Sequence, residues 1–334
     1  MLKDDLFAVL ATLNDAGTSD IRLVASELAR RPEGEAVALL ETAVGLAGTA
    51  QLVRENDPLL RTMLPTLHPE RLEATRRYLA GIREAGCRVL TLWDRDYPER
   101  LRRIAGPPLV LYLRGSVFPG RTPVAIVGTR QASRRGLTVA GKFARSLAER
   151  GVTVIGGLAR GVDSAAHEAA LDAGGTTLAV LAGHVDHIYP PENEALAKRV
   201  ESSGALVSEV TRLAQVHKGR FVERNRITSG LSERVLIAES RRSGGTMQQA
   251  RFSLAQGRPT FVIDQGEFET SEARAGFQAL VAMGAVAVRD PEAFVASRFD
   301  VKAVSPPDTG EVPVLRLATI KMSAEDLPKD LRDE

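Results

Sequence analysis

The 334-residue sequence contains a single cysteine, Cys87, so an internal disulfide bond and a multi-cysteine metal cluster are both excluded. It contains no run of about 18 apolar residues, so no transmembrane helix is predicted. Asp4 and Asp5 stand near the N-terminus, where a secretory signal peptide would be basic, which disfavours secretion. These features predict a cytoplasmic protein without a membrane partner.

The net charge is also small: the sequence has 44 Lys and Arg residues and 42 Asp and Glu residues, which leaves a net charge of +2. That total alone disfavours a strongly basic nucleic-acid binder. The charge is segregated, however: residues 121–145 contain 6 basic side chains and no acidic one, and residues 241–258 contain 4 and none. A local positive region is what binds phosphates, so a nucleic-acid partner is not excluded.

Hydrophobic periodicity divides the chain into four parts. Residues 1–86 carry apolar side chains at helical spacing, which predicts an N-terminal helical domain. Residues 87–122 contain two strand patterns and form a connecting β module. Residues 123–300 alternate apolar strands with segments long enough for crossover helices. Residues 301–334 are expected to form a tail, with no room for a winged helix.

Seven short apolar runs define the third part. Continuously apolar strands are typical of a parallel sheet covered on both faces. We therefore expect an α/β fold, with a doubly wound, mostly parallel Rossmann-like sheet and an N-terminal helical domain. The predicted strands are Val124–Val127, Val152–Ile155, Thr177–Leu181, Ala205–Ser208, Val235–Ala238, Thr260–Ile263 and Val286–Val288.

Ligands of such sheets bind at the carboxyl ends of the strands. After the first strand, Gly128 allows a turn, and a helix is expected to begin near Gly136. The free N–H groups of a helix start favour anions, and Arg130 and Ser133 add a charge and a hydroxyl. The segment lacks the G-x-G-x-x-G pattern, so a nicotinamide dinucleotide is not supported. A phosphate site is favoured over a tight turn with a surface arginine.

Two more glycine turns follow strands in the same way. One contains Gly157 and Arg160, with Asp163 as the expected cap of the next helix. The other, at residues 244–246, comprises Gly244, Gly245 and Thr246 and opens a further helix. We predict that both turns contribute to the same anion-binding edge, and we identify no catalytic residue in them.

A basic run at residues 217–226 contains five Lys, Arg or His side chains around Phe221. Arginine suits phosphates because its planar fork makes bidentate contacts. Phe221 offers either a stacking face for a base or a core side chain. Such a run is usually a solvated face, but its place among glycine turns favours a binding function.

A loop with His184, Asp186 and His187 invites a metal interpretation. No further ligand cluster accompanies it, and the spacing has no strong metal geometry, so neither a metal nor a cofactor is predicted. The Pro190–Pro191 pair fixes a rigid loop that would shape one wall of a pocket.

Several separated motifs occur in a consistent order. They are DRDYPERL, PPLVLYLRG, VAIVGTR, GLARGVDSAAH, YPPEN, FVERNRITSGLS, and GxxxLVxxGA at residues 276–285. Together they resemble the DprA or Smf family of DNA-processing proteins, over roughly residues 88–296.

The resemblance implies a Rossmann-like domain that binds single-stranded DNA, forms a homodimer and loads the recombinase RecA, notably in natural transformation and homologous recombination. An apolar stripe at Phe277, Leu280, Val281 and Met283 would serve either the dimer or the core. The resemblance also implies that the strand pocket is formed by Gly128, Thr129, Arg130, Ser133, Arg160, Lys218, Arg220, Arg224, Asn225 and Arg226.

Two alternatives belong to the same superfamily. The LOG-type phosphoribohydrolases use a glutamate in a P-G-G-x-G-T-x-x-E motif, and this position is Gln249 here, which cannot act as a carboxylate. An enzyme is therefore not predicted. A sensor that binds a free nucleotide stays open, since the same anion-binding turns would serve it.

Overall fold

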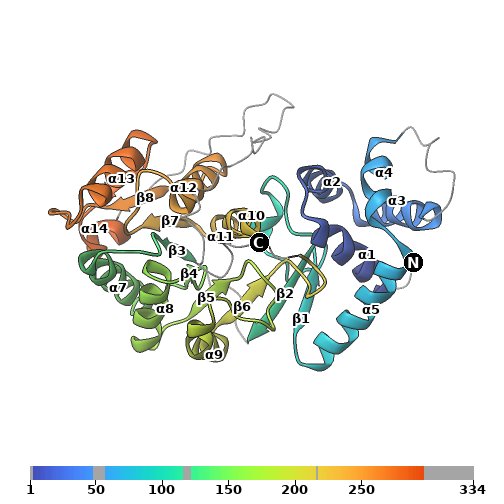
Figure 1. Cartoon of the computed structure of the whole chain (residues 1–334), viewed down its shortest axis with the longest axis horizontal. Helices are drawn as coiled ribbons and strands as arrows, with labels where there is room; N and C mark the ends of the chain where they lie inside the picture. Colours follow the sequence, from blue (N-terminus) through green and yellow to red (C-terminus); the bar gives the residue numbers. More distant parts are fainter. Residues whose placement is uncertain (1–2, 48–56, 116–121, 216, 297–334) are drawn as a thin grey trace.

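A computed structural model describes residues 3–47, 57–115, 122–215 and 217–296 of the chain (Figure 1). The predicted tail, residues 301–334, lies outside these ranges. The described N-terminal region consists of helices joined by short turns, as its periodicity predicts. Its helices are α1 (Lys3–Ala16), α2 (Ser19–Arg30), α3 (Glu33–Leu46), α4 (Pro58–Met63), a 3-10 turn (Leu64–Thr66) and α5 (Pro69–Glu84).

The helical region has its own apolar interior. On α1, the side chains from Phe7 to Leu13 are buried, and α1 packs along α5. The side-chain oxygen of Thr18 accepts the N–H of Ile21 at 3.2 Å and caps α2, which fixes a tight turn between α1 and α2. This turn faces the sheet domain, because the Arg220 side chain lies against its Gly17.

The described strands form one nine-stranded sheet in the order β1-β2-β6-β5-β4-β3-β7-β8-β9. All pairings from β3 to β9 are parallel, whereas β1 and β2 are antiparallel and extend the sheet at the β6 edge. The strands are β1 (Arg88–Thr91), β2 (Val110–Gly115), β3 (Val124–Val127), β4 (Val154–Gly156), β5 (Thr177–Val180), β6 (Ala205–Ser208), β7 (Arg234–Ile237), β8 (Thr260–Ile263) and β9 (Val286–Val288).

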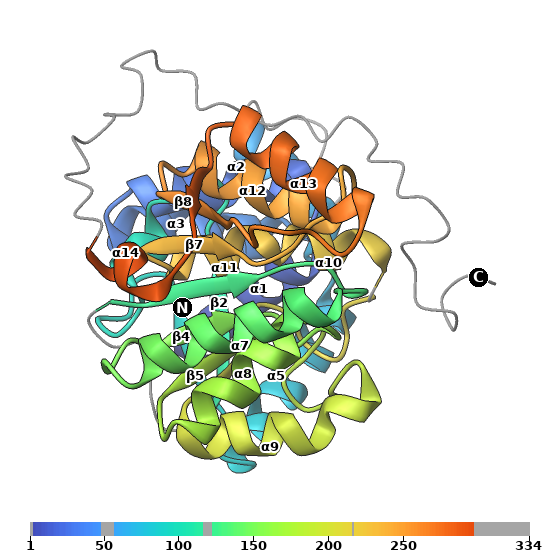
Figure 2. The ribbon, with the colours of Figure 1, turned by 90° about the vertical axis from the view of Figure 1, so that its left-hand side faces the viewer.

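Helices cover both faces of this sheet, which confirms the predicted doubly wound α/β class (Figure 2). Alternate side chains of β3 fall in separate apolar clusters, because neighbouring residues of a strand point to opposite faces. The sheet-domain helices are α6 (Glu99–Arg102), α7 (Arg134–Ala148), α8 (Val162–Asp172), α9 (Glu194–Ser203), α10 (Lys218–Glu223), α11 (Asn225–Leu231), α12 (Gly245–Ala255), α13 (Ser271–Ala282) and α14 (Pro291–Ala296).

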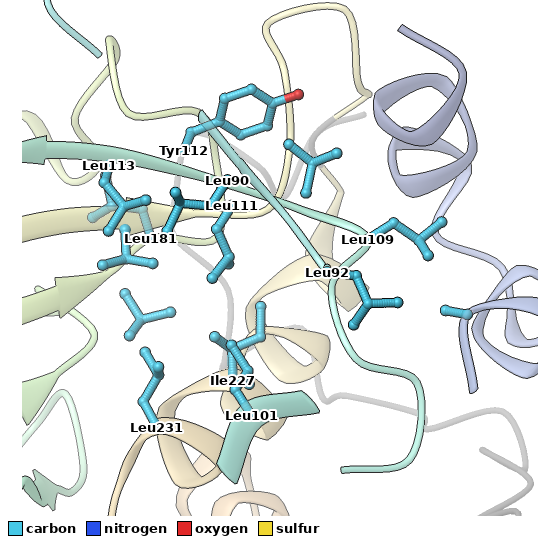
Figure 3. Close-up of a cluster of buried hydrophobic side chains, with 14 of the residues drawn as sticks. Leu90, Leu92, Leu101, Leu109, Leu111, Tyr112, Leu113, Leu181, Ile227 and Leu231 are labelled. Carbon is cyan, nitrogen blue, oxygen red and sulfur yellow. The ribbon is translucent and has the colours of Figure 1, made fainter. Parts of the chain in front are cut away.

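One cluster joins the antiparallel strands to α11. Leu90 of β1 and Leu111 of β2 meet Leu101 of α6 and Ile227 and Leu231 of α11 (Figure 3). These side chains are at most 8% exposed. The basic run at residues 217–226 therefore leads into α11, and the apolar side chains of α11 are part of the core.

Candidate functional site

A pocket lies beyond the carboxyl ends of β3, β4 and β5, at the edge where ligands of open α/β sheets bind. Its lining combines arginines with aromatic and small side chains: Arg130, Gly157, Ala159, Arg160, Leu181, Ala182, Gly183, His187, Tyr189, Pro190, Phe221 and Arg224. Four of the residues predicted to bind phosphate are brought together here, namely Arg130, Gly157, Arg160 and Arg224.

Arg130 and two aromatic rings form one wall. The Arg130 guanidinium lies over the Phe221 ring, 5.1 Å from its centroid. Tyr189 meets the same ring edge-on, with centroids 5.6 Å apart and planes at 65°. Such a contact between a guanidinium and a ring is attractive and holds both side chains in place. Phe221 is thus a pocket residue, which settles the choice between a pocket and a core position.

Arg224 supplies a buried charge at the same pocket. It is 7% exposed, and its Nη1 donates to the carbonyl of Val180 at the end of β5. A Cβ on Gly157 would overlap this guanidinium, so a glycine is required there for close approach. Burial lowers the pKa of Arg224 to about 10, with a contribution from Arg130, so the side chain stays cationic at neutral pH.

Asp163 lies beneath Arg224 and organises the second glycine turn. Its Oδ2 accepts the N–H of Gly157 at 2.8 Å. Burial raises the pKa of Asp163, and the nearby Arg224 charge lowers it. Asp163 is not the helix cap that was predicted, because Gly161 precedes α8 and Asp163 stands inside its first turn. Instead of capping α8, the Asp163 carboxylate binds the N–H of Gly157.

His167 is a buried packing residue. Its Nδ1 lies 2.7 Å from Thr177 Oγ1, and the side chain is fully buried. Burial and the neighbouring Arg224 charge lower the pKa of His167 to about 3, so the ring is neutral at pH 7.

The second turn also contains Leu158 with φ +56°, an uncommon conformation for a residue with a side chain. The Nδ2 of Asn193 donates to the carbonyl of Leu158 at 2.8 Å and to Ser164 Oγ at 3.0 Å. Asn193 ends the YPPEN motif, and Pro190 of that motif lines the pocket, as predicted. Sequence reasoning missed Asn193, since nothing in the sequence reveals which turn it contacts.

Arg160 lines the pocket but is already paired. Its Nε donates to Glu192 Oε1, and both side chains are about half exposed, at 47% and 50%. The hydrogen bond from Arg160 lowers the pKa of Glu192. A bound anion would therefore compete with Glu192 for this guanidinium.

The first turn contains an internal anion. Helix α7 begins at Arg134, two residues before the predicted start, and Ser133 caps it by accepting the N–H of Gly136 at 2.9 Å. The Ser133 hydroxyl donates to the carboxylate of Glu239, which also accepts the Ser133 N–H at 2.8 Å. Glu239 therefore occupies the place predicted for a phosphate at this helix start. Its position directly after β7 is the signal that could have identified it.

Gly128 and Thr129 form the backbone of that turn. The N–H of Thr129 donates to the carbonyl of Glu239 at 2.9 Å, and a Cβ on Gly128 would lie 2.5 Å from Val162 Cγ2. These two residues shape the loop that carries Arg130 to the pocket.

The profile of the family described as DNA recombination-mediator protein A matches residues 88–298, well over half of the chain. The chain belongs to this family. It is 34% identical over 196 residues to the DNA processing protein DprA of Bacillus subtilis and 37% identical over 198 residues to the protein Smf of Escherichia coli. These matches cover 58% and 59% of the chain, and 66% and 52% of the two relatives.

Solved structures of the family share the fold. The X-ray structure of Streptococcus pneumoniae DprA superposes with a TM-score of 0.62 at 24% identity, covering 84% of this chain and 98% of that one. A Helicobacter pylori DNA processing protein A, whose structure is described as giving insights into its single-stranded DNA binding mode, superposes at 0.55 with 28% identity. That match covers 63% of this chain and 94% of the other.

Arg226 of the FVERNRITSGLS motif, and Arg220 directly before that motif, face away from the pocket. Arg220 and Arg226 are 4% and 5% exposed and bind groups near the N-terminal helices. Arg226 makes a bidentate ion pair with Glu209, at 2.9 and 2.6 Å, and its Nε donates to the carbonyl of Gly106 at 3.0 Å. Lys218 begins α10, partly exposed, one turn before Phe221.

The third glycine turn lies beside α11. Gly244 has φ +111° and precedes α12, and the carbonyl of Gly245 accepts Asn225 Nδ2 at 3.3 Å. Thr246 follows on α12 and, like Gly244 and Gly245, is not among the described residues that line the pocket. Gln249 is buried and donates to the carbonyl of Asn225 at 3.2 Å, so this position points into the α11–α12 contact.

Among the described residues, no group of three His, Cys, Asp or Glu side chains gathers in an arrangement suited to a metal ion. His184 and Asp186 instead pair with each other, and Asp186 also binds Arg212. Within the same residues, no helix has the length and apolar character needed to cross a bilayer.

Proposed function

We propose that the chain binds single-stranded DNA in the Arg130 pocket and acts in DNA processing. The observation that carries the proposal is the convergence of three arginines with the Phe221–Tyr189 pair in one cavity. Single-strand binding proteins combine positive charge that follows the backbone with aromatic faces that stack on bases.

The geometry suggests how the work is divided. Arg130 is held on the Phe221 ring and donates toward a phosphate, while the exposed parts of Phe221 and Tyr189 face a base. Arg224 is fixed by Val180 and Gly157 and provides a charge that does not move. The turn at residues 157–161 acts mainly as a scaffold, because Asp163 holds the N–H of Gly157.

Two wider roles follow from the family. The Bacillus subtilis relative is called DNA processing protein DprA, and the motif series supports loading of a RecA-type recombinase in recombination or transformation. Homodimer formation is proposed on the same ground. Of the apolar stripe on and after α13, Leu280 is fully buried in the core, whereas Val281 is 41% exposed and available to a second copy.

The test is a binding titration with a single-stranded oligonucleotide, a duplex control and a salt series. The wild type is expected to prefer the single strand and to weaken as salt rises. Arg130→Ala is expected to lose about tenfold in affinity and to reduce the salt slope by about 0.7. Arg103→Ala is the matched control, since the Arg103 side chain is 76% exposed and pairs with Glu99 one helical turn away. A folded Arg130→Ala protein with wild-type affinity would refute the site.

A nucleotide sensor is the second candidate, because the same arginines and aromatic rings would suit the phosphate and the base of a free nucleotide. It predicts a thermal shift with a nucleoside monophosphate and none with an oligonucleotide. The phosphoribohydrolase alternative predicts release of free base. The buried side chain of Gln249 argues against it.

A further inference from the structure

Helix α10 faces two parts of the molecule. Phe221 lines the pocket, whereas Arg220 and Glu223 point toward the N-terminal helices. In Figure 1, α10 and α11 lie between α12 and α2. A six-residue helix has little stability of its own, so its position depends on what it packs against.

The turn between α1 and α2 holds the outer face of α10 at two points. The Arg220 guanidinium donates to the carbonyl of Asp15 and lies directly against Gly17, where a Cβ would overlap it. Arg22 Nη2 lies 2.7 Å from Glu223 Oε1, with the two side chains only 18% and 13% exposed. Arg22 also donates to the carbonyl of Gly17 at 3.0 Å.

This turn is itself fixed to the sheet. Asn14 accepts the N–H of Leu109 at 2.9 Å and donates to the carbonyl of Glu209. The carboxylate of Asp15 accepts both the N–H and the hydroxyl of Thr211. All of these side chains are buried, so the end of α1 and the loop after β6 form one polar network.

The geometry points to Arg22 and Glu223 as positioning residues for the DNA pocket. Through this ion pair and the Arg220 contact, the N-terminal helices set α10 so that Phe221 stays beneath Arg130 and beside Tyr189. The helices lie outside the family match at residues 88–298, so this assigns a function to a part of the chain that the match does not cover. The inference rests on the proposed binding of single-stranded DNA.

The experiment measures single-strand affinity for Arg22→Ala and Glu223→Gln in the full chain. Both variants are expected to bind about fivefold more weakly, since each removes one charge of the ion pair. The two substitutions change the net charge in opposite directions. A purely electrostatic effect on DNA would therefore make Glu223→Gln bind more tightly, and that result would overturn the inference.

A double-mutant cycle with Phe221→Ala identifies the route. If Arg22 acts through Phe221, Arg22→Ala has little further effect in the Phe221→Ala background. An undiminished effect there would contradict the inference. Arg30→Ala is the control, because Arg30 lies on the same helix, carries the same charge and pairs with Glu27 in solvent.

Two further outcomes separate this inference from the proposed function. A wild type that binds no single strand refutes both. A wild type that binds, is weakened by Arg130→Ala and is unaffected by Glu223→Gln refutes the positioning function alone. Because Glu223→Gln keeps the size of the side chain, it tests the inference even if Arg22→Ala does not fold.

Discussion

Arg224 and Arg226 are two residues apart, are both almost fully buried, and have different environments. Arg226 is neutralised by a bidentate pair with Glu209 and a bond to the carbonyl of Gly106. Arg224 is held by the carbonyl of Val180 and has no salt bridge to any residue that the structure describes. Asp163 lies near enough to affect its pKa but is occupied by the turn at Gly157.

The difference shows what makes a buried arginine available to a ligand. A guanidinium whose fork is filled by a carboxylate contributes to structure, and a further anion gains little from it. One that is fixed by a neutral carbonyl keeps its charge for the pocket. We therefore expect Arg226 to affect the stability of the fold and Arg224 to affect binding.

Removing Arg226 should have the largest effect on stability. Arg226→Ala leaves Glu209 buried without its partner and is expected to lower the free energy of unfolding by about 3–5 kcal/mol. Urea unfolding measures this. The salt slope of DNA binding by the folded protein should stay at the wild-type value. A loss below about 1 kcal/mol, or a reduced salt slope, would contradict the structural role.

Asp15 gives the helical interface a pH dependence. Burial raises its pKa from 3.8 to about 6, against weaker opposing effects of Thr211, so the folded state favours the protonated form. The stabilising contribution of the protonated Asp15 carboxyl is therefore fully present below pH 3.8, and it is lost as the pH rises through about 6. Asp15→Asn should therefore be more stable than the wild type at pH 8, by up to about 3 kcal/mol.

The measurement is urea unfolding of both proteins from pH 4 to pH 8. The advantage of Asp15→Asn should shrink toward pH 4, because the wild-type carboxyl is then protonated. Both proteins keep His167, whose lowered pKa acts in the opposite direction, so their difference isolates Asp15. Parallel stability curves across this range would contradict the assignment.

Gly157 tests the pocket side of the comparison. A Cβ at this position overlaps the Arg224 guanidinium, so Gly157→Ala should displace Arg224 and weaken single-strand binding about tenfold. Stability should fall by about 1–3 kcal/mol. Gly81→Ala is the control, since a Cβ there meets nothing within 4 Å. Equal affinities for the two variants would show that Arg224 does not need its present position.

Much of this fold could be predicted from the sequence. Continuously apolar runs such as Ala205–Ser208 and Thr260–Ile263 are strands with the predicted bounds, because burial on both faces leaves a clear signal. Other strand bounds differ by one or two residues: the predicted Val152–Ile155 is Val154–Gly156, and the predicted Val235–Ala238 is Arg234–Ile237. The edge of the sheet at which the pocket lies follows from the parallel topology.

The site could be predicted only in part. Residue type and position identified Arg130, Gly157, Arg160 and Arg224, which line the pocket. The sequence could not show that Arg220 faces Asp15, because that depends on how the N-terminal helices pack on the sheet. Likewise, the sequence shows that Ser133 offers a hydroxyl at a helix start. Only the structure shows that this hydroxyl is bonded to the Glu239 carboxylate.

The smallest expected effect concerns the exposed edge of the pocket, where Arg160 pairs with Glu192. Exposed ion pairs contribute little to stability, so Glu192→Gln should leave the free energy of unfolding nearly unchanged. It also removes the carboxylate with which a phosphate would compete for Arg160, so single-strand affinity should rise about two- to threefold at low salt. Raising the salt should reduce that gain, because both charges are in solvent. A titration at two salt concentrations measures it, and weaker binding would mean that Glu192 is needed to hold Arg160 in place for DNA.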